Sequence, residues 1–310
     1  MQDFRIGLDL GGTKLAGVIT DANSKILASR MQLVSPNADA VIMAMKRMIG
    51  QLCTAVNVTS KDVSFVGVGV PALISNSGAI YSCTHIPSLA EIDLSFELNG
   101  LGTWKLGIDN DVNCAAISAI KAHGPSFFLV TIGTGLGGAL VLDNRLVRGS
   151  RGFAGEIGHI IVQAGGRLCP CGKRGCAEAY SCGLALTKRV EEEFENGNLR
   201  EFLNAQHPNQ RPSPRDVLER SYLSPVAKDI HREFCFYIAV AVSGMLEIVD
   251  AEKILIGGGV SSSFDFFKDE LVRAYHDVMA PNRMRQDIEF IRIENGPMAG
   301  ALGASQLDSV

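Results

Sequence analysis

Six consecutive residues near the start of the chain, Asp9-Leu10-Gly11-Gly12-Thr13-Lys14, carry groups that can hold a phosphate. The two glycines leave backbone N–H groups open to an anion, and the threonine and lysine after them supply a hydroxyl and a cation. The leading aspartate can orient a hydrated magnesium ion. Because an ordinary glycine hairpin with a flanking salt bridge has the same composition, this stretch alone leaves both interpretations open.

A second glycine-rich motif is Thr131-Ile132-Gly133-Thr134-Gly135-Leu136-Gly137-Gly138. Its first two residues end a predicted strand at residues 128–132, and its glycine turn begins at Gly133. A dinucleotide-binding fingerprint does not explain this turn, because such a fingerprint is followed by a helix and residues 139–142 are predicted to form a strand. A third turn, Gly257-Gly258-Gly259, stands between a predicted strand and a predicted helix. A simple hairpin explains any one of these turns, but the three together favour a nucleotide clamped between two lobes.

The polar pair Asn110-Asp111 stands at the junction between a predicted strand at residues 105–109 and a predicted helix at residues 112–123. Side chains at the end of a sheet project into whatever cleft lies there, and a carboxylate in that place can act as a general base. The simpler alternative is that Asn110 or Asp111 only caps the helix that follows.

Three of the eight cysteines, Cys169, Cys171 and Cys176, lie within eight positions of one another. With His159 they supply three thiols and one imidazole, the donor set of a closed, tetrahedral structural zinc site. Glycines between the ligands allow a short backbone to wrap an ion, and four protein ligands leave no open coordination position for catalysis. The alternative is a loop of unligated thiols.

Hydrophobic periodicity predicts the same order of elements in two halves of the chain. The first half begins with three strands around the first glycine turn, followed by a helix over residues 38–56 and a buried strand over residues 63–70. The second glycine turn and its two strands repeat that opening. Strands at residues 253–256 and 288–293 follow a largely helical region. A last helix near residues 298–307 has small residues on one face, which would let it pack closely on a sheet.

The composition sets limits on the class of protein. The 310 residues are 46% hydrophobic and 20% charged with a net charge of −4, which excludes disorder and collagen. The acidic balance leaves no basic patch for nucleic acid or membrane, the longest apolar runs fall short of the about 20 residues of a membrane span, and no leader pattern opens the chain. We therefore expect a cytoplasmic protein without a nucleic-acid or membrane partner, in which the other five cysteines are free thiols.

The whole chain resembles the actin-like ATPase superfamily and, within it, the ROK family of repressors, open reading frames and sugar kinases. Asp9 to Lys14 resembles the first phosphate loop of that family, Thr131 to Gly138 the second, and Ile256 to Val260 the adenosine motif. The resemblance implies an α/β, two-lobe actin-like ATPase fold of duplicated ribonuclease-H-like units, with ATP and Mg²⁺ in the interlobe cleft.

The same resemblance sets expected lobe boundaries. Residues 1–117 are expected to form the N-terminal α/β lobe, with the C-terminal helix at about 296–310 packed back on it. Residues 118–295 are expected to form the larger lobe, which carries the zinc loop.

The string Asn110-Asp111-Val112-Asn113 matches the catalytic motif of the ROK family, in which the aspartate takes the proton from the attacking sugar hydroxyl. The resemblance therefore implies that Asp111 is a general base and not only a helix cap. It also implies a set of residues that bind sugar hydroxyls: Asn110, Asp111, Glu156, His159 and Glu178. As isolated residues the two glutamates would more simply be solvated surface charges. The spacing from His159 to Cys176 is that of the zinc-containing ROK kinases, so a structural zinc ion would fix the loop that presents these side chains.

Three positions depart from the family pattern. Ala72 stands where many members have glycine, and His85 stands where many have asparagine. Both segments are expected near the sugar, so they bear on which sugar is bound more than on the reaction. Ala139 replaces a frequent glycine after the second phosphate loop.

These resemblances imply an ATP-dependent kinase that phosphorylates the C6 hydroxyl of a hexose or N-acetylhexosamine, as a homodimer or homotetramer. Glucose ranks first, N-acetylglucosamine and N-acetylmannosamine follow, and allose or fructose come last. Two other classes compete: a sugar-responsive repressor and a catalytically silent sugar sensor. ROK repressors place a DNA-binding domain before the sugar site, whereas here the first phosphate loop begins almost at the N-terminus. Intact Asp9, Thr13 and Asp111 disfavour the sensor.

Overall fold

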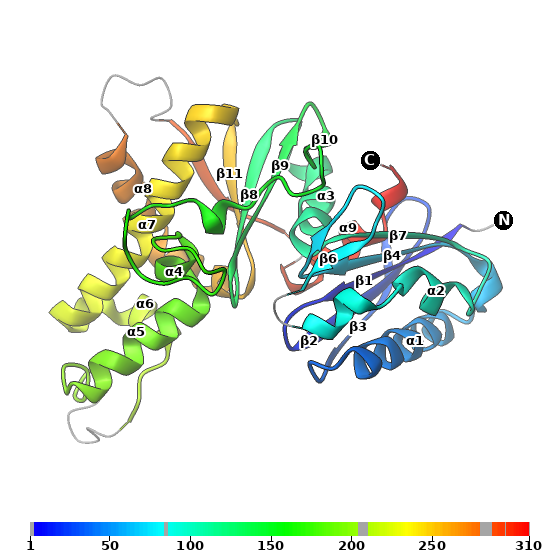
Figure 1. Cartoon of the computed structure of the whole chain (residues 1–310), viewed down its shortest axis with the longest axis horizontal. Helices are drawn as coiled ribbons and strands as arrows, with labels where there is room; N and C mark the ends of the chain where they lie inside the picture. Colours follow the sequence, from blue (N-terminus) through cyan, green and yellow to red (C-terminus); the bar gives the residue numbers. More distant parts are fainter. Residues whose placement is uncertain (1–2, 84–85, 204–209, 280–286, 295, 310) are drawn as a thin grey trace. The chain divides into compact units, whose positions relative to one another are not determined.

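The first sheet has the strand order β3-β2-β1-β4-β7 in the computed structural model, which describes residues 3–83, 86–203, 210–279, 287–294 and 296–309 (Figure 1). Its strands are β1 (Phe4–Leu10), β2 (Lys14–Thr20), β3 (Ile26–Leu33), β4 (Val63–Val70) and β7 (Lys105–Asn110). The first three form an antiparallel meander, and β4 and β7 run parallel to β1. In this register Asp9 lies opposite Gly69, and Gly69 lies opposite Asp109. The carboxyl ends of three parallel strands therefore meet at one edge. The family departure at His85 lies outside the described residues.

The second sheet has the strand order β10-β9-β8-β11-β12. Its strands are β8 (Phe127–Ile132), β9 (Leu136–Leu142), β10 (Arg145–Leu146), β11 (Lys253–Gly257) and β12 (Glu289–Arg292). As in the first sheet, three consecutive strands lie in reverse order and two later strands extend the sheet on the side of the first. This shared order confirms the predicted repeat.

Helices pack against both sheets, as Figure 1 shows. Their bounds are α1 (Ala38–Ala55), α2 (Leu94–Asn99), α3 (Asp111–His123), α4 (Glu178–Ser181), α5 (Gly183–Glu195), α6 (Pro214–Arg220), α7 (Pro225–Val249), α8 (Phe264–Val278) and α9 (Ala299–Ala304). A short hairpin of β5 (Leu73–Ile74) and β6 (Ile80–Ser82) follows β4. Among the described residues, no helix is both long and apolar enough to cross a bilayer.

Helix α1 shows how the periodicity builds the core. Val41, Met45, Met48 and Leu52 recur every three or four residues, and all four side chains are fully buried on the face toward the first sheet. Asn37 starts the helix by accepting a hydrogen bond from the backbone N–H of Ala40. The predicted helix over residues 38–56 is therefore confirmed to within one residue.

The C-terminal helix α9 packs on β1, β4 and α3 through small side chains. A Cβ at Gly7 of β1 would lie 1.8 Å from the backbone oxygen of Ala301, so this approach requires glycine. The close packing predicted for this helix is confirmed, although the helix is shorter than the predicted residues 298–307.

The chain divides into two compact units. The first unit comprises Met1–Phe127, Ala139–Gly155 and Glu294–Val310, and the second comprises Phe128–Gly138 and Glu156–Ile293. Residues 118–127 and 139–155 thus group with the first unit, whereas the sequence analysis assigned them to the larger lobe. One reason is that α3 is a single helix, from Asp111 to His123, that packs against α9 of the first unit.

Candidate functional site

Asp9 and Asp111 come together in the first unit, at the carboxyl end of β1. Gly69 of β4 lies beside both, because a Cβ there would be 3.4 Å from Asp9 Oδ1 and 3.3 Å from the Asp111 Cα. Gly300, near the start of α9, makes room in the same way, since a Cβ there would lie 2.4 Å from Asp9 Oδ2. Because Gly69 and Gly300 have no side chain, there is room for the carboxylates of Asp9 and Asp111 to lie close together.

The electrostatics of this pair fit a bound cation. Asp9 Oδ1 is buried and finds no hydrogen-bond partner among the described residues. Burial first, and the Asp111 charge second, raise the pKa of Asp9 well above its ordinary value. Burial also raises the pKa of the Cys114 thiol, which lies beneath these carboxylates. Because divalent cations bind carboxylate oxygens, the Asp9 carboxylate fits the magnesium ion that the sequence analysis expects it to orient.

We expect an Asp9→Asn variant to be more stable than the unaltered protein when no divalent cation is added. The change removes a poorly solvated charge and its repulsion with Asp111, so a gain of about 1 kcal/mol, or ~2–4 °C in Tm, is expected. Thermal unfolding measures this directly. The control is Asp143→Asn in the same unit, an exposed turn position with φ +52° that asparagine also adopts, which should leave Tm unchanged. A lower Tm for Asp9→Asn would show that Asp9 stabilises the fold and has no need of a cation.

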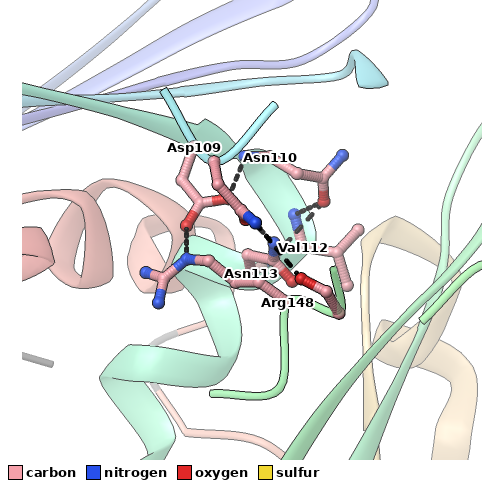
Figure 2. Close-up of polar contacts among 7 residues, drawn as sticks. Asp109, Asn110, Val112, Asn113 and Arg148 are labelled. Carbon is pink, nitrogen blue, oxygen red and sulfur yellow. Dashed lines mark hydrogen bonds and ion pairs between the residues drawn. The ribbon is translucent and has the colours of Figure 1, made fainter. Parts of the chain in front are cut away.

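Polar contacts fix the start of α3, where Asp111 is the first helical residue; Figure 2 shows the contacts of the neighbouring residues Asp109, Asn110 and Asn113. Asn110 is the N-cap, and its Oδ1 accepts hydrogen bonds from the backbone N–H groups of Val112 at 2.9 Å and Asn113 at 3.3 Å. Its Nδ2 donates to the carbonyl of Ala72 at 3.1 Å. The alternative that Asn110 caps the helix is therefore correct, and Asp111 is the first helical residue. A sugar-binding role for Asn110 stays a prediction.

Asp109 is a site residue that the sequence analysis did not single out. It is buried, and its Oδ1 accepts hydrogen bonds from Asn113 Nδ2 at 2.8 Å and from the Asn110 backbone N–H at 2.7 Å (Figure 2). Its Oδ2 pairs with Arg148 Nε at 2.8 Å. The carboxylate therefore fixes the backbone on which Asp111 stands. The signal available in the sequence was an aspartate at the end of the predicted strand, directly before the Asn110-Asp111 pair.

An Asp109→Ala variant should lower the free energy of unfolding by about 2–4 kcal/mol, because it leaves the partly buried Arg148 and the Asn113 amide without their acceptor. Urea unfolding followed by circular dichroism measures the loss. The matched control is Glu97→Ala, which breaks the more exposed Lys46–Glu97 pair and should cost about 0–1 kcal/mol. Equal losses in the two variants would contradict the role given to Asp109.

The first glycine turn also belongs to the first unit and joins β1 to β2. The backbone N–H of Gly11 donates to the Lys14 carbonyl at 2.7 Å, which closes the turn. Thr13 and Lys14 are exposed, as groups that receive a phosphate must be. Gly12 lies in the turn between Gly11 and Thr13 and is partly exposed. The hairpin alternative is correct for the backbone, and the exposed side chains of Thr13 and Lys14 stay accessible to an anion.

The second and third glycine turns lie side by side in the second unit. Strands β8 and β11 are parallel neighbours that set Gly257 opposite Thr131, so the turns after them share one edge. Gly258 has φ +82°, and a Cβ there would lie 2.5 Å from the Ile132 carbonyl oxygen. Gly259 and the exposed Thr134 flank this contact. The structure thus brings together Gly133, Thr134, Gly135 and the triple glycine that sequence analysis assigned to nucleotide binding.

The predicted zinc ligands converge in the second unit. One ligand atom from each of His159, Cys169, Cys171 and Cys176 lies within 4.8 Å of all the others. Cys171 and Cys176 Sγ are 3.7 Å apart, and Cys169 Sγ is 3.8 Å from His159 Nδ1. A tetrahedron with bonds of about 2.3 Å has edges of about 3.8 Å, so the donor set fits zinc in both chemistry and spacing. Burial raises the pKa of the Cys169 thiol to about 12.

His159 is predicted both as a metal ligand and as a sugar ligand. The two roles are compatible because the imidazole ring has two nitrogens, which face different groups. Nδ1 faces the cysteines, while Nε2 lies 3.8 Å from Glu156 Oε2. A carboxylate near the second nitrogen of a metal-ligating histidine is a common way to orient the ring. Glu156 itself is 44% exposed and accessible to a ligand.

Glu178 is not the solvated surface charge of the simpler alternative. Its Oε2 accepts a hydrogen bond from the backbone N–H of Leu136 at 2.9 Å, and its Oε1 lies 3.8 Å from Cys169 Sγ. The carboxylate therefore stands between the second glycine turn and the candidate metal-binding cluster of His159, Cys169, Cys171 and Cys176. Sequence reasoning missed this contact, because residues 136 and 178 are far apart in the chain.

Two sheets of the same strand order, each with a glycine turn after its first strand, define the two-lobe actin-like ATPase fold. The structure matches a ROK family glucokinase from Streptomyces griseus, solved in complex with glucose and AMPPNP, with a TM-score of 0.80 and 26% identity over 98% of both chains. The chain belongs to the ROK family, whose model matches residues 5–309.

Relatives of different activity share this family. The chain is 27% identical to a glucokinase of Streptomyces coelicolor, covering 97% of this chain and 96% of the relative. It is 28% identical to an N-acetylmannosamine kinase of Pasteurella multocida, covering 97% and 94%. It is 24% identical to the xylose repressor of Bacillus subtilis, covering 98% of this chain and 76% of the repressor.

Proposed function

We propose that this protein is an ATP-dependent sugar kinase that phosphorylates the C6 hydroxyl of a hexose. The carboxylate pair of Asp9 and Asp111 carries the proposal. A buried carboxylate oxygen that finds no donor in the described part of the chain, close to a second carboxylate at a helix start, is costly for the fold unless it meets a cation or a substrate proton. Phosphoryl transfer uses both, and it needs little other chemistry from the protein.

The proposed reaction assigns a task to each group. The Asp111 carboxylate accepts the proton of the sugar C6 hydroxyl as that oxygen forms its bond to the γ-phosphorus. The bond from the γ-phosphorus to the oxygen shared with the β-phosphate breaks, and ADP leaves with that oxygen. Magnesium, held by Asp9, would neutralise charge on the phosphates. Backbone N–H groups of the turns at Gly11 and Gly133 hold the phosphates, and the turn at Gly258 receives the adenosine.

Sugar recognition is assigned to Glu156, His159 and Glu178, together with Asn110 and Asp111. A carboxylate accepts two hydroxyl donors, and neighbouring hydroxyls of a sugar come in pairs, which suits this set. The glucokinases of the two Streptomyces species support glucose as the first candidate. The Pasteurella relative supports N-acetylmannosamine, with N-acetylglucosamine beside it, as the second. We further propose a structural zinc ion, a cytoplasmic location and a homodimer or homotetramer.

The match to the xylose repressor supports a second candidate, a sugar-binding regulator without phosphoryl transfer. The two candidates share a sugar site and differ in turnover. A regulator binds sugar and releases no ADP, and it has no need for the costly pairing of Asp9 with Asp111.

A coupled assay of ADP release over a panel of sugars tests the proposal. The panel holds glucose, N-acetylglucosamine, N-acetylmannosamine, mannose, allose, fructose and xylose, each with ATP and magnesium. The kinase proposal expects sugar-dependent ADP release, fastest with glucose, and a phosphorylated sugar in equal amount. Sugar binding by calorimetry with no ADP release from any sugar would favour the regulator.

A further inference from the structure

We infer that Glu178 is a positioning residue for the second glycine turn and that it connects this turn to the metal-binding cluster. The main contact is the hydrogen bond from the Leu136 backbone N–H to Glu178 Oε2, at 2.9 Å. A charged acceptor makes such a bond stronger than a neutral one. Because Leu136 directly follows Gly135, the bond holds the turn at its last residue.

The shape of the turn agrees with this role. A Cβ at Gly135 would lie 2.5 Å from Glu178 Oε2, so the absence of a side chain lets the carboxylate reach Leu136. On its other side the turn accepts a hydrogen bond at the Gly133 carbonyl from the Gly183 backbone N–H, at 2.8 Å. Residues 178–183 therefore hold the turn at both of its ends.

The same segment begins at the metal-binding cluster. Cys176 is a proposed ligand two residues before Glu178, and Cys169 Sγ lies 3.8 Å from Glu178 Oε1. The Ala177 backbone N–H donates to the Ile160 carbonyl, next to the ligand His159, at 3.0 Å. A metal ion that fixes the cysteines thus also fixes the base of the Glu178 side chain, and through it the turn.

This inference rests on the proposed function, in which the second turn holds the phosphates of ATP, and it adds a role for Glu178 that is separate from sugar binding. If Glu178 acted only on the sugar, its loss would leave nucleotide affinity unchanged in the absence of sugar. If it positions the turn, its loss weakens nucleotide binding with no sugar present.

The test is calorimetric titration of the full-length, metal-loaded protein with AMPPNP and magnesium, without sugar. Glu178→Ala should raise the Kd about tenfold, the size expected for one hydrogen bond to a charged acceptor. Glu178→Gln keeps an oxygen that can accept from Leu136, and its Kd should stay within about threefold of the unaltered value. Both variants should retain the metal content of the unaltered protein, which shows that their fold is intact.

A double-mutant cycle separates positioning from a general loss of structure. Gly135→Ala places a methyl group where the Glu178 carboxylate lies, so alone it should also raise the Kd about tenfold. In the Glu178→Ala background the methyl group meets no carboxylate, and the further change should be at most about twofold.

Two results would overturn the inference while leaving the kinase proposal in place: an unchanged nucleotide Kd in Glu178→Ala, or a Gly135→Ala effect of equal size in both backgrounds. Failure of the unaltered protein to bind AMPPNP would overturn the proposed function and this inference with it.

Discussion

An Asp111→Asn variant is expected to lose sugar-dependent ADP formation by about 10³-fold, because general-base catalysis of this kind contributes about 10²–10⁴-fold. The amide has the shape of the carboxylate but cannot take the proton of the C6 hydroxyl. Its oxygen can still accept the hydrogen bond that Asp111 Oδ1 accepts from the Val112 backbone N–H, at 3.0 Å. The start of α3 should therefore keep its structure, and sugar affinity by calorimetry should change by no more than about threefold.

The control is Asp93→Asn, the same change at another helix start in the first unit. Asp93 caps α2 by accepting from the backbone N–H groups of Ser95 and Phe96, and asparagine caps helices equally well. This variant should turn over at the rate of the unaltered protein. Turnover of Asp111→Asn near that rate would rule out Asp111 as the base, whatever its effect on stability.

A Cys176→Ser variant is expected to lose the bound metal and a large part of its thermal stability. Cys176 is fully buried and offers one of the four ligand atoms of the proposed zinc site. Three ligands hold zinc less tightly, and the region at residues 159–178, which has no regular sheet or long helix of its own, depends on the ion. We expect the metal content to fall from about one equivalent to less than half, and Tm to fall by ~5–10 °C, or roughly 2–4 kcal/mol.

Elemental analysis of protein purified without added metal, together with thermal unfolding, measures both effects. Cys182→Ser is the matched control, six positions along the chain and outside the cluster. Its Sγ accepts a hydrogen bond from the Ala185 backbone N–H at the start of α5, a cap that serine also forms. Full metal content in Cys176→Ser, or an equal loss of Tm in the control, would contradict the assignment of the cluster.

The parts of the fold that the sequence predicted well are those decided by local pattern. The helix at α1 and the strand at β4 follow from side-chain periodicity over a few turns or residues, and the structure changes their ends by at most one position. The glycine turns were predicted because clusters of glycine between two regular elements are typical of short connections. Between Pro71 and Trp104, by contrast, β5, β6 and α2 are two to six residues long. Elements this short give no period to detect, and the sequence analysis did not predict them.

The parts of the site that could not be predicted depend on residues far apart in the chain. The pairing of Asp109 with Arg148 joins positions 39 apart, and the contact of Glu178 with Leu136 joins positions 42 apart. Gly300 makes room for Asp9 from the other end of the chain. The first two contacts depend on how distant loops and strands pack, and the third depends on how α9 folds back on the first sheet. Those features are set by the whole fold, so no single motif contains them.

The proposed function requires that the phosphoryl group of ATP be transferred to the C6 oxygen of a sugar. The most direct measurement compares ADP release with glucose and with 6-deoxyglucose, which lacks that oxygen, at sugar concentrations where calorimetry shows both to be bound. We expect rapid ADP release with glucose, one glucose phosphate formed for each ADP, and only background release with 6-deoxyglucose. Equal ADP release with both sugars, or none with either while both bind, would contradict the proposed function.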